Sequence, residues 1–215
     1  MRTVAYEALR QQIQALDLEP GFVTSDSELA RRLGMSRTPV REALTLLERD
    51  FLVTRIPNHG VRIRDITTDE IVHILNMREA LDGMAARLAA TRIEDKVLDH
   101  FQRAFEEAAA QEGGIQPKQH AKLSQELHST VIVATGNPFL QSTSQTLRGI
   151  FERSRQHGWR TWSRTTDARS ISDSRYAEHL AIISALRRRD PDAAEAAARV
   201  HVANGLRDIL KALLS

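Results

Sequence analysis

The sequence predicts a mainly α-helical protein in two parts: three helices followed by a β-hairpin, and then an all-α bundle of six helices. Three observations lead to this prediction. Apolar residues recur at helical spacing along most of the 215 residues. Two short β-prone runs flank a Pro-Asn-His-Gly turn at residues 57–60. From Thr67 onward the periodic segments are all helical, with Gly or Pro between several of them.

Composition limits the classes of protein that this chain can belong to. An apolar fraction of 41% permits hydrophobic cores, and a formal charge of +2 means that any affinity for nucleic acid depends on a local basic patch. No cysteine is present, which excludes disulfides and thiolate chemistry. No apolar run has the length of a membrane-spanning helix, and the N-terminus carries no signal-peptide pattern. We therefore expect a soluble, cytoplasmic protein without a membrane partner.

The N-terminal part begins with an amphipathic helix over residues 4–16, which Pro20-Gly21 ends. A second helix carries the apolar residues Leu29, Ala30 and Leu33, and Gly34 turns the chain after it. Ser36 is the predicted N-cap of a third helix that ends near residue 49. The apolar positions of this third helix are i, i+3, i+4 and i+7, namely Val40, Ala43, Leu44 and Leu47.

Arginines occupy the opposite face of the third helix. Arg31, Arg32, Arg37 and Arg41 supply four positive charges with no acid between the first and the last of them. Such a run is often only the solvated face of a helical hairpin. Here the run leads into the N-terminal end of the third helix, which is the second helix of a helix–turn–helix. Side chains at that end reach base edges in a DNA major groove. The sequence therefore favours DNA binding over the solvated-face alternative.

A β-hairpin follows, with β-prone runs at residues 52–56 and 61–64. The alternation of Val61 and Ile63 with Arg62 and Arg64 predicts two arginines on one face of this wing. Three helices and a hairpin make a winged helix–turn–helix domain, which we place at residues 1–66.

The second domain, residues 67–215, is predicted as a six-helix bundle. Thr67 and Glu70 form a capping box, and Asn137 and Asp190 each precede a proline at a helix start. The predicted helices cover residues 67–92, 94–111, 117–136, 137 to about 153–157, 172–189 and 190–213, with an irregular segment at 158–166.

At this point the sequence resembles the GntR family of bacterial transcription regulators, in the FadR-like subgroup with an FCD-type effector domain. The N-terminal residues that carry the resemblance are Glu28-Leu-Ala, the block from Leu33 to Leu44, Leu46-Leu-Glu and Pro57-Asn-His-Gly60. The C-terminal ones are Arg78-Glu-Ala-Leu, residues 85–90, His128, Gly136-Asn-Pro, Glu178-His179 and His201. The resemblance implies a homodimeric regulator, a repressor and not an enzyme, whose affinity for an operator responds to a small carboxylic acid bound by residues 67–215.

The resemblance also implies which residues contact DNA. These are Ser36, Arg37, Thr38 and Arg41 from the recognition helix, and His59 and Gly60 from the wing tip. A guanidinium can bind guanine O6 and N7 with two hydrogen bonds, which agrees with the two arginines. The chain departs from the family at Ser27, where some relatives carry a DNA-contacting arginine, and at Phe51, where a glycine is usual.

Three histidines match the family's metal ligands: His128, His179 and His201, each on a different predicted helix. Three neutral imidazoles suit zinc or nickel. The fourth ligand in the family is an aspartate one turn before the first histidine, and Ser124 stands at that position. Three alternatives follow for this site. Water or the carboxylate of the effector completes a three-histidine metal centre, the site binds metal only weakly, or it has become a metal-free polar pocket. The plain alternative is that these histidines only form hydrogen bonds within the core.

Two arginines are candidates for binding the effector, because the guanidinium fork matches a carboxylate. Arg78 and Arg148 are these candidates, and a surface ion pair is the alternative for each. Trp159 and Trp162 either cover the pocket or pack at the end of the bundle. Most of the remaining histidines are expected to face solvent: His73, His100, His120 and His157.

Two other functions stay open on the sequence alone. A three-histidine zinc centre with an open position is also a catalytic pattern, so the chain can be a metalloenzyme domain fused to a DNA-binding head. Glu126 and Glu178 are the carboxylates near the histidines in that case. The other alternative is a metal-free domain that binds a hydrophobic ligand, which elemental analysis of the purified protein distinguishes.

Overall fold

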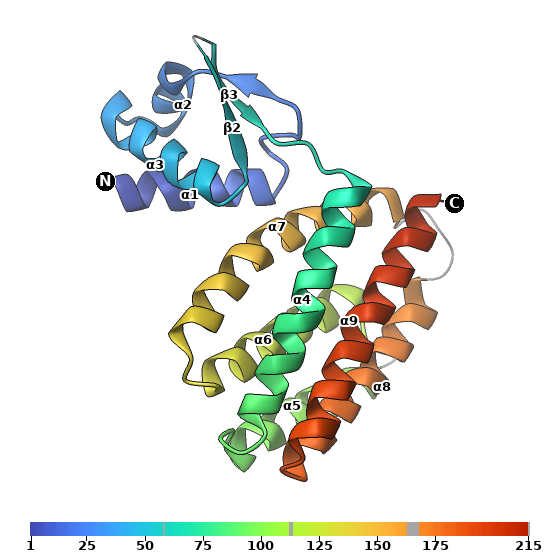
Figure 1. Cartoon of the computed structure of the whole chain (residues 1–215). Coiled ribbons are helices and arrows are strands. Elements are labelled where there is room, and N and C mark those ends of the chain that lie inside the picture. Colours follow the sequence, from blue (N-terminus) through green and yellow to red (C-terminus); the bar gives the residue numbers. More distant parts are fainter. Residues whose placement is uncertain (58, 112–113, 163–167, 215) are drawn as a thin grey trace. The chain divides into compact units, whose positions relative to one another are not determined.

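The chain is mainly helical and divides into two compact units, shown in Figure 1. The computed structural model describes residues 1–57, 59–111, 114–162 and 168–214, with side chains except those of residues 117, 152–162, 168–173 and 212–214. One unit comprises residues 1–71 and 146–160, and the other comprises residues 72–145 and 161–215.

The N-terminal unit contains the predicted three helices and hairpin. Its elements are α1 (Arg2–Gln14), β1 (Val23–Thr24), α2 (Asp26–Leu33), α3 (Arg37–Arg49), β2 (Val53–Ile56) and β3 (Gly60–Ile63). The sheet is antiparallel in the order β1-β3-β2, with Val23 opposite Arg62 and Ile56 opposite Gly60. Strand β1 was not predicted, because two residues are too few to show an alternating pattern.

The apolar pattern of α3 builds the core of this unit. Val40, Ala43, Leu44 and Leu47 are all buried, as the spacing predicted. Helix α1 packs against α3 and contributes the buried residues Ala5, Leu9 and Ile13, and β3 contributes the buried residues Val61 and Ile63. Burial of this stripe leaves the opposite face of α3 in contact with solvent.

The turn between α2 and α3 confirms one expectation and corrects another. Gly34 ends α2 with φ +63°, in the left-handed region that glycine enters without steric cost. Ser36 is the N-cap of α3, but its hydroxyl makes no capping hydrogen bond. Pro39 explains this, because it stands at the third helical position and has no N–H to donate.

Phe51 shows how the chain enters the wing without the usual glycine. Its φ is +59°, so it adopts the left-handed conformation after α3 that a glycine would take, at a cost of about 1–2 kcal/mol. The Arg64 guanidinium lies 5.7 Å from the centre of the Phe51 ring, and this cation–π contact offsets part of that cost.

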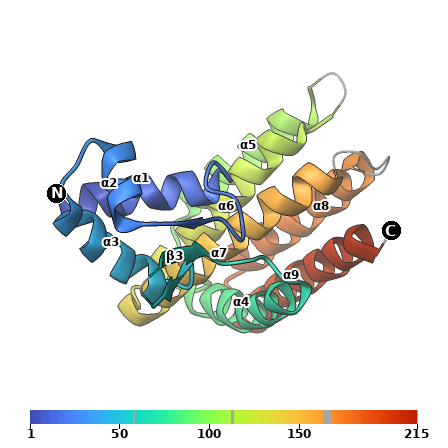
Figure 2. The ribbon, with the colours of Figure 1, turned by 90° about the horizontal axis from the view of Figure 1, so that it is seen from above.

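The C-terminal unit is built from helices whose apolar faces meet in one core. They are α4 (Thr68–Ala89), α5 (Asp95–Ala109), α6 (Pro117–Ala134), the first part of α7 (Pro138–Trp162), α8 (Ala168–Arg187) and α9 (Pro191–Leu214). Residues 146–160 of α7 group with the N-terminal unit. Helices α8 and α9 lie side by side, as Figures 1 and 2 both show. Buried members of the core include Phe101, Phe105, Leu127, Ile183 and Leu186.

The helix boundaries in this unit agree with the capping signals, with one correction. Thr67 Oγ1 accepts from the Glu70 N–H at 3.1 Å, and Asn137 Oδ1 accepts from the N–H groups of Phe139 and Leu140. Residues 158–162 were predicted to be irregular but continue α7, since a glycine inside a helix costs only about 1 kcal/mol. The rest of the predicted irregular segment, residues 163–166, lies outside the described residues.

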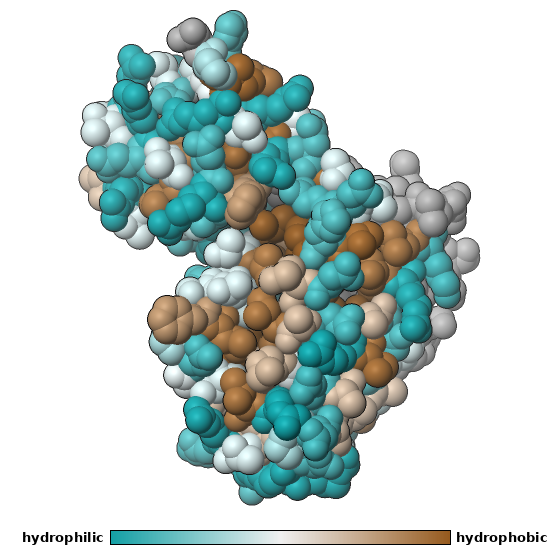
Figure 3. Space-filling model, viewed as in Figure 1, coloured by the Kyte–Doolittle hydropathy of each residue, from teal (hydrophilic) through white to brown (hydrophobic). Residues whose placement is uncertain are grey.

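Part of the surface of the C-terminal unit is apolar. Figure 3 shows apolar residues gathered over α4 and α9, and the exposed large side chains of these helices include Met77, Met84 and Val200. Within the described residues, none of the helices combines the length and hydropathy needed to cross a membrane.

A hydrogen bond between α1 and the end of α3 gives the first testable prediction. The Tyr6 hydroxyl donates to Asp50 Oδ2 at 2.5 Å, and burial together with this carboxylate raises the pKa of Tyr6 to about 12. Because a hydrogen bond to a charged group is involved, Tyr6→Phe should lower the free energy of unfolding at pH 7 by about 1–2 kcal/mol. Denaturant unfolding measures this loss.

The raised pKa predicts the pH at which this stabilisation disappears. A tyrosine whose pKa is higher in the folded state stabilises the protein fully below pH 10 and loses its contribution as the pH rises towards 12. Ultraviolet titration of the wild type should show one of its two tyrosines ionising near pH 12, and Tyr6→Phe should lack that step. Two tyrosines titrating together near pH 10 would contradict the assignment.

Candidate functional site

The exposed face of α3 forms the candidate DNA-reading surface. Arg37, Thr38, Arg41 and Thr45 lie on it, and we name these four residues the recognition face. They line one open hollow together with Asp26 and Glu42. The four side chains are exposed, so they can reach a partner without any change in the core. Ser36 precedes them at the helix N-terminus, where N–H groups favour an anion such as a phosphate.

The basic run before α3 is less uniform than the sequence suggested. Arg31 makes a two-point contact with the Glu28 carboxylate, with Nη2–Oε1 at 2.5 Å and Nε–Oε2 at 3.2 Å. The Arg31 guanidinium lowers the pKa of the Glu28 carboxyl, so this pair is charged on both sides at neutral pH. Because the Glu28 carboxylate offsets the charge of Arg31, the two arginines of the recognition face, Arg37 and Arg41, supply a larger share of the local positive potential than the sequence suggested.

The wing tip holds the other two predicted residues. His59 is exposed, and its Nδ1 donates to the carbonyl oxygen of Pro57 at 2.9 Å, which leaves Nε2 on the outer side of the ring. Gly60 has φ +98°, and a Cβ there would lie 2.2 Å from the carbonyl oxygen of Thr24 in β1. Gly60 is therefore required for β1 to pack against the hairpin, whatever it does on DNA.

The two wing arginines differ in their surroundings. Arg62 is exposed on β3. Arg64 is half-buried and donates to Glu70 Oε1 at 2.9 Å. The burial of Val61 and Ile63 agrees with the predicted alternation, but the Glu70 carboxylate pairs with Arg64 and leaves Arg62 as the exposed arginine of the two.

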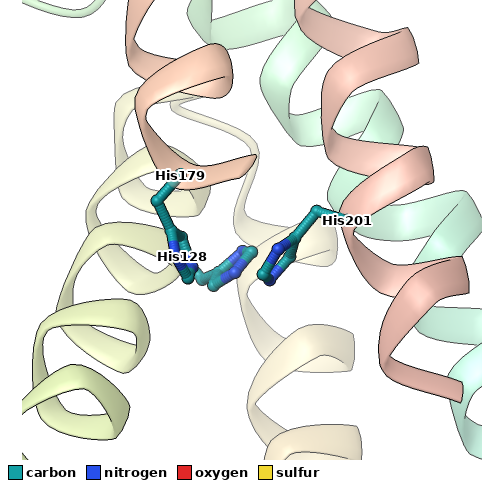
Figure 4. Close-up of side chains that lie close together, drawn as sticks. All are labelled: His128, His179 and His201. Carbon is teal, nitrogen blue, oxygen red and sulfur yellow. The ribbon is translucent and has the colours of Figure 1, made fainter. Parts of the chain in front are cut away.

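Three imidazoles converge inside the C-terminal unit. His128 comes from α6, His179 from α8 and His201 from α9, as predicted, and we name these three the histidine cluster (Figure 4). Each offers one ring nitrogen, and the three nitrogens lie within 4.8 Å of one another. Ring centroids are 4.3 Å apart for His179 and His201 and 5.0 Å apart for His128 and His201.

Carboxylates stand behind two of these rings. Glu178 Oε2 lies 2.9 Å from His201 Nδ1, and Asp82 Oδ2 lies 3.5 Å from His128 Nδ1. Because a carboxylate only accepts, Nδ1 of His201 carries the proton and the lone pair is left on Nε2. Such a carboxylate behind a histidine is the usual way in which proteins orient a metal-binding imidazole. The sequence analysis missed Asp82, whose signal was an acidic residue four positions after Arg78.

The outer carboxylates are themselves held in place. Asp82 accepts from Arg78 Nη2 at 2.8 Å, and Glu178 Oε1 accepts from the Asn204 amide at 2.6 Å. Arg175 donates to Glu178 Oε2 at 3.3 Å and to the backbone oxygen of His201 at 2.6 Å. Glu178 is one of the two carboxylates expected near the histidines, and both of its oxygens accept hydrogen bonds from these donors.

The surroundings keep two of the three imidazoles, those of His179 and His201, neutral. Burial, reinforced by the neighbouring histidines, lowers the pKa of His179 well below its usual value. Burial also lowers the pKa of His201, with His128, Arg175 and Arg78 as further causes. A neutral imidazole has the lone pair that a metal ligand needs, so the donor set fits a borderline divalent ion such as zinc or nickel.

Ser124 and His120 complete the surroundings of His179. Ser124 Oγ lies 3.0 Å from His179 Nε2, so the hydroxyl at the family's aspartate position contacts the cluster directly. His120 was expected to face solvent but is only 8% exposed, with its ring 5.0 Å from that of His179 and 6.0 Å from that of Phe105. Burial and the nearby Arg175 lower the pKa of His120 to about 4. Its Nε2 is buried and has no hydrogen-bond partner among the described residues.

The other predicted residues differ in how close they lie to this cluster. His73 and His100 are exposed, as expected, whereas the side chains of His157, Trp159 and Trp162 lie outside the described residues. Arg78 is close enough to lower the pKa of His201 and is mostly buried. Arg148 is half-buried on α7, in the stretch that groups with the N-terminal unit.

Comparison with known proteins agrees with both units. The family described as bacterial regulatory proteins, gntR family, matches residues 2–63, and the FCD domain matches residues 73–204. The Nta operon transcriptional regulator of Aminobacter aminovorans is 30% identical over 89% of this chain and 86% of its own. The HTH-type transcriptional repressor RspR of Escherichia coli is 26% identical over 92% of this chain and 83% of its own. The structure of E. coli McbR/YncC shares the fold, with a TM-score of 0.77, 20% identity and coverage of 98% of this chain and 97% of that one.

Two glycines with positive φ give a matched pair of variants for the DNA-binding unit. Gly60→Ala places a Cβ against the backbone of β1 and should lower the free energy of unfolding by about 3 kcal/mol. Gly34→Ala has the same kind of backbone strain but no atom within 4 Å of the new Cβ, so it should cost only about 1 kcal/mol. Equal losses in denaturant unfolding would show that the contact with β1 does not require Gly60.

Proposed function

This chain belongs to the GntR family of transcriptional regulators and carries an FCD domain, and on that premise we propose that a small carboxylic acid, bound at a metal centre formed by the histidine cluster, controls its affinity for an operator. The convergence of three imidazoles from α6, α8 and α9, with the pKa values of His179 and His201 lowered by burial, is the observation that carries this proposal. The residues proposed to contact DNA are Ser36, Arg37, Thr38, Arg41, His59 and Gly60.

The donor set favours zinc or nickel as the metal. His128, His179 and His201 would hold the ion, which would supply a positive charge and a coordination position for the effector. Asp82 and Glu178 would orient two of these imidazoles from behind. A metal-free pocket for a hydrophobic ligand is less well supported, because the centre of this region is lined by ring nitrogens and a hydroxyl.

The charges around the cluster favour an anion as the effector. Each carboxylate beside the cluster already accepts hydrogen bonds from other side chains, and no carboxylate belongs to the group of donor atoms among the described residues. Arg78 and Arg175 add positive potential, since both are among the causes that lower the pKa of His201. We propose Arg78 as an effector contact and Arg148 as a second candidate.

We propose that the regulator works as a homodimer and represses transcription. The exposed apolar side chains on α4 and α9 support an interface between two copies, because monomers rarely expose a large apolar patch (Figure 3). A dimer would place two recognition faces on two half-sites of a pseudo-palindrome. Ligand binding that weakens DNA binding would then relieve repression. The metalloenzyme alternative gains no support, since the relatives are named regulators.

The recognition face is tested by Arg41→Ala. Loss of one guanine contact in each half-site should cost about 2–6 kcal/mol in total, so affinity for an operator selected from random DNA should fall at least about 30-fold. Gel shift measures the affinity, and light scattering checks that the oligomeric state is unchanged. Arg103→Ala is the matched control, because Arg103 is an exposed arginine of α5 outside the N-terminal unit. Unchanged operator binding by Arg41→Ala would refute the assignment of the recognition face.

Ser124 tests the metal centre and the effector together. Ser124→Asp adds a carboxylate beside His179 and should raise zinc affinity at least about tenfold, because opposite charges attract strongly at short range in a buried site. The same charge should lower the affinity of the zinc-loaded protein for malonate, used here as a small carboxylate probe. Ser124→Asn has the same size without the charge and should change neither affinity by as much.

Competition with a zinc indicator dye measures the metal affinity, and calorimetry measures malonate binding. If Ser124→Asp and Ser124→Asn bind zinc equally, the charge of the donor set does not control the site. If the wild type binds no zinc at all, the histidine cluster is not a metal centre.

A further inference from the structure

One arginine of the wing contacts three elements of the DNA-binding unit. Arg55 lies on β2, and its Nη1 is 3.4 Å from both carboxylate oxygens of Asp26 at the start of α2. Its Nη2 donates to the backbone oxygen of Arg41, in α3, at 3.1 Å. A single guanidinium therefore joins the wing, the first helix of the helix–turn–helix and the recognition helix.

The backbone of the same residue makes a second contact with α3. The Arg55 N–H donates to Glu48 Oε1 at 3.0 Å. Arg41 and Glu48 are seven residues apart, which is about 10 Å along a helix. Because β2 holds α3 at two separated points, the helix is restrained against rotation about its own axis as well as against translation.

Rotation of α3 is the motion that base recognition tolerates least. Functional side chains must be held within roughly 0.5 Å and 10–20° of their working geometry. A helix with side chains has a radius of about 5–6 Å, so a rotation of 10° moves a side chain by about 1 Å. The Arg55 contact is made with Arg41 itself, whose side chain belongs to the recognition face.

The surroundings of Arg55 speak against a direct contact with phosphate. Its side chain is 32% exposed and lies against the Asp26 carboxylate, which is 15% exposed. Asp26 partly cancels the positive charge that a phosphate would be attracted to. Arg62, on the neighbouring strand, is exposed and is a better candidate for such a contact.

We propose that Arg55 is a positioning residue for sequence recognition, which fixes the rotation of α3 through Asp26 and the carbonyl oxygen of Arg41. This rests on the proposed function, because it assumes that the recognition face reads an operator. Arg55 acts through Arg41 and need not touch DNA. Its loss should therefore reduce discrimination between sequences while general affinity for DNA stays the same.

The test compares Arg55→Gln with Arg62→Gln in the full-length protein. A duplex selected from random DNA by the wild type serves as the operator, and a scrambled duplex of equal length measures general affinity, each at several salt concentrations. Arg55→Gln should lower operator affinity about tenfold and leave scrambled-duplex affinity and the salt dependence unchanged. Arg62→Gln should lower both affinities and reduce the salt slope by about one per protomer, as expected for a lost phosphate contact.

Arg55→Lys keeps the charge but lacks the planar fork, so it should retain the pairing with Asp26 and still lose most of the discrimination. If Arg55→Gln fails to fold, Arg55→Lys takes its place in the comparison with Arg62→Gln. Equal losses on the operator and the scrambled duplex, or the same pattern in Arg55→Gln and Arg62→Gln, would overturn the proposal. A wild type that prefers no sequence would instead refute the proposed function, so the two failures are distinguishable.

Discussion

The packing of three imidazoles against one another, with His179 and His201 buried and His128 half-buried, is the constraint on which the C-terminal unit depends. Polar groups removed from water are costly unless they form hydrogen bonds, and a charged imidazole there would cost more still. Burial lowers the pKa values of His179 and His201, so the rings remain neutral. Asp82 lies beside His128 Nδ1 and Glu178 beside His201 Nδ1, so these two carboxylates orient two of the rings from outside. Four helices, α4, α6, α8 and α9, therefore contribute to a single polar centre within an apolar bundle.

This arrangement separates the groups that orient the imidazoles from the groups that would bind a ligand. The carboxylates of Asp82 and Glu178 lie behind the rings and are paired with Arg78, Arg175 and Asn204. The inner side presents ring nitrogens and the Ser124 hydroxyl. Among the described residues the donor group is made of ring nitrogens without a carboxylate, which suits an anion that binds together with, or after, a divalent metal ion. The N-terminal unit follows a comparable principle, since Arg55 orients the recognition face from behind.

Local patterns in the sequence predicted much of this structure. The spacing of Val40, Ala43, Leu44 and Leu47 fixed the buried face of α3, and Gly34 marked the turn before it. The metal-type histidines came from the family resemblance, and the structure brings all three together. What the sequence did not reveal depends on contacts between distant segments. Strand β1 exists only because β3 pairs with it, and His120 is buried only because Phe105 and His179 pack against it.

Control of DNA binding by the effector requires that the histidine cluster and the DNA-binding face are coupled, and coupling between two sites is reciprocal. Zinc and malonate affinities should therefore be measured on the wild-type protein, free and saturated with its selected operator. At least one of the two affinities should differ between the free and the operator-bound protein by about 5–150-fold, the usual range for allosteric coupling. Identical affinities in both states would refute the coupling, because a ligand that binds both states equally cannot change DNA binding.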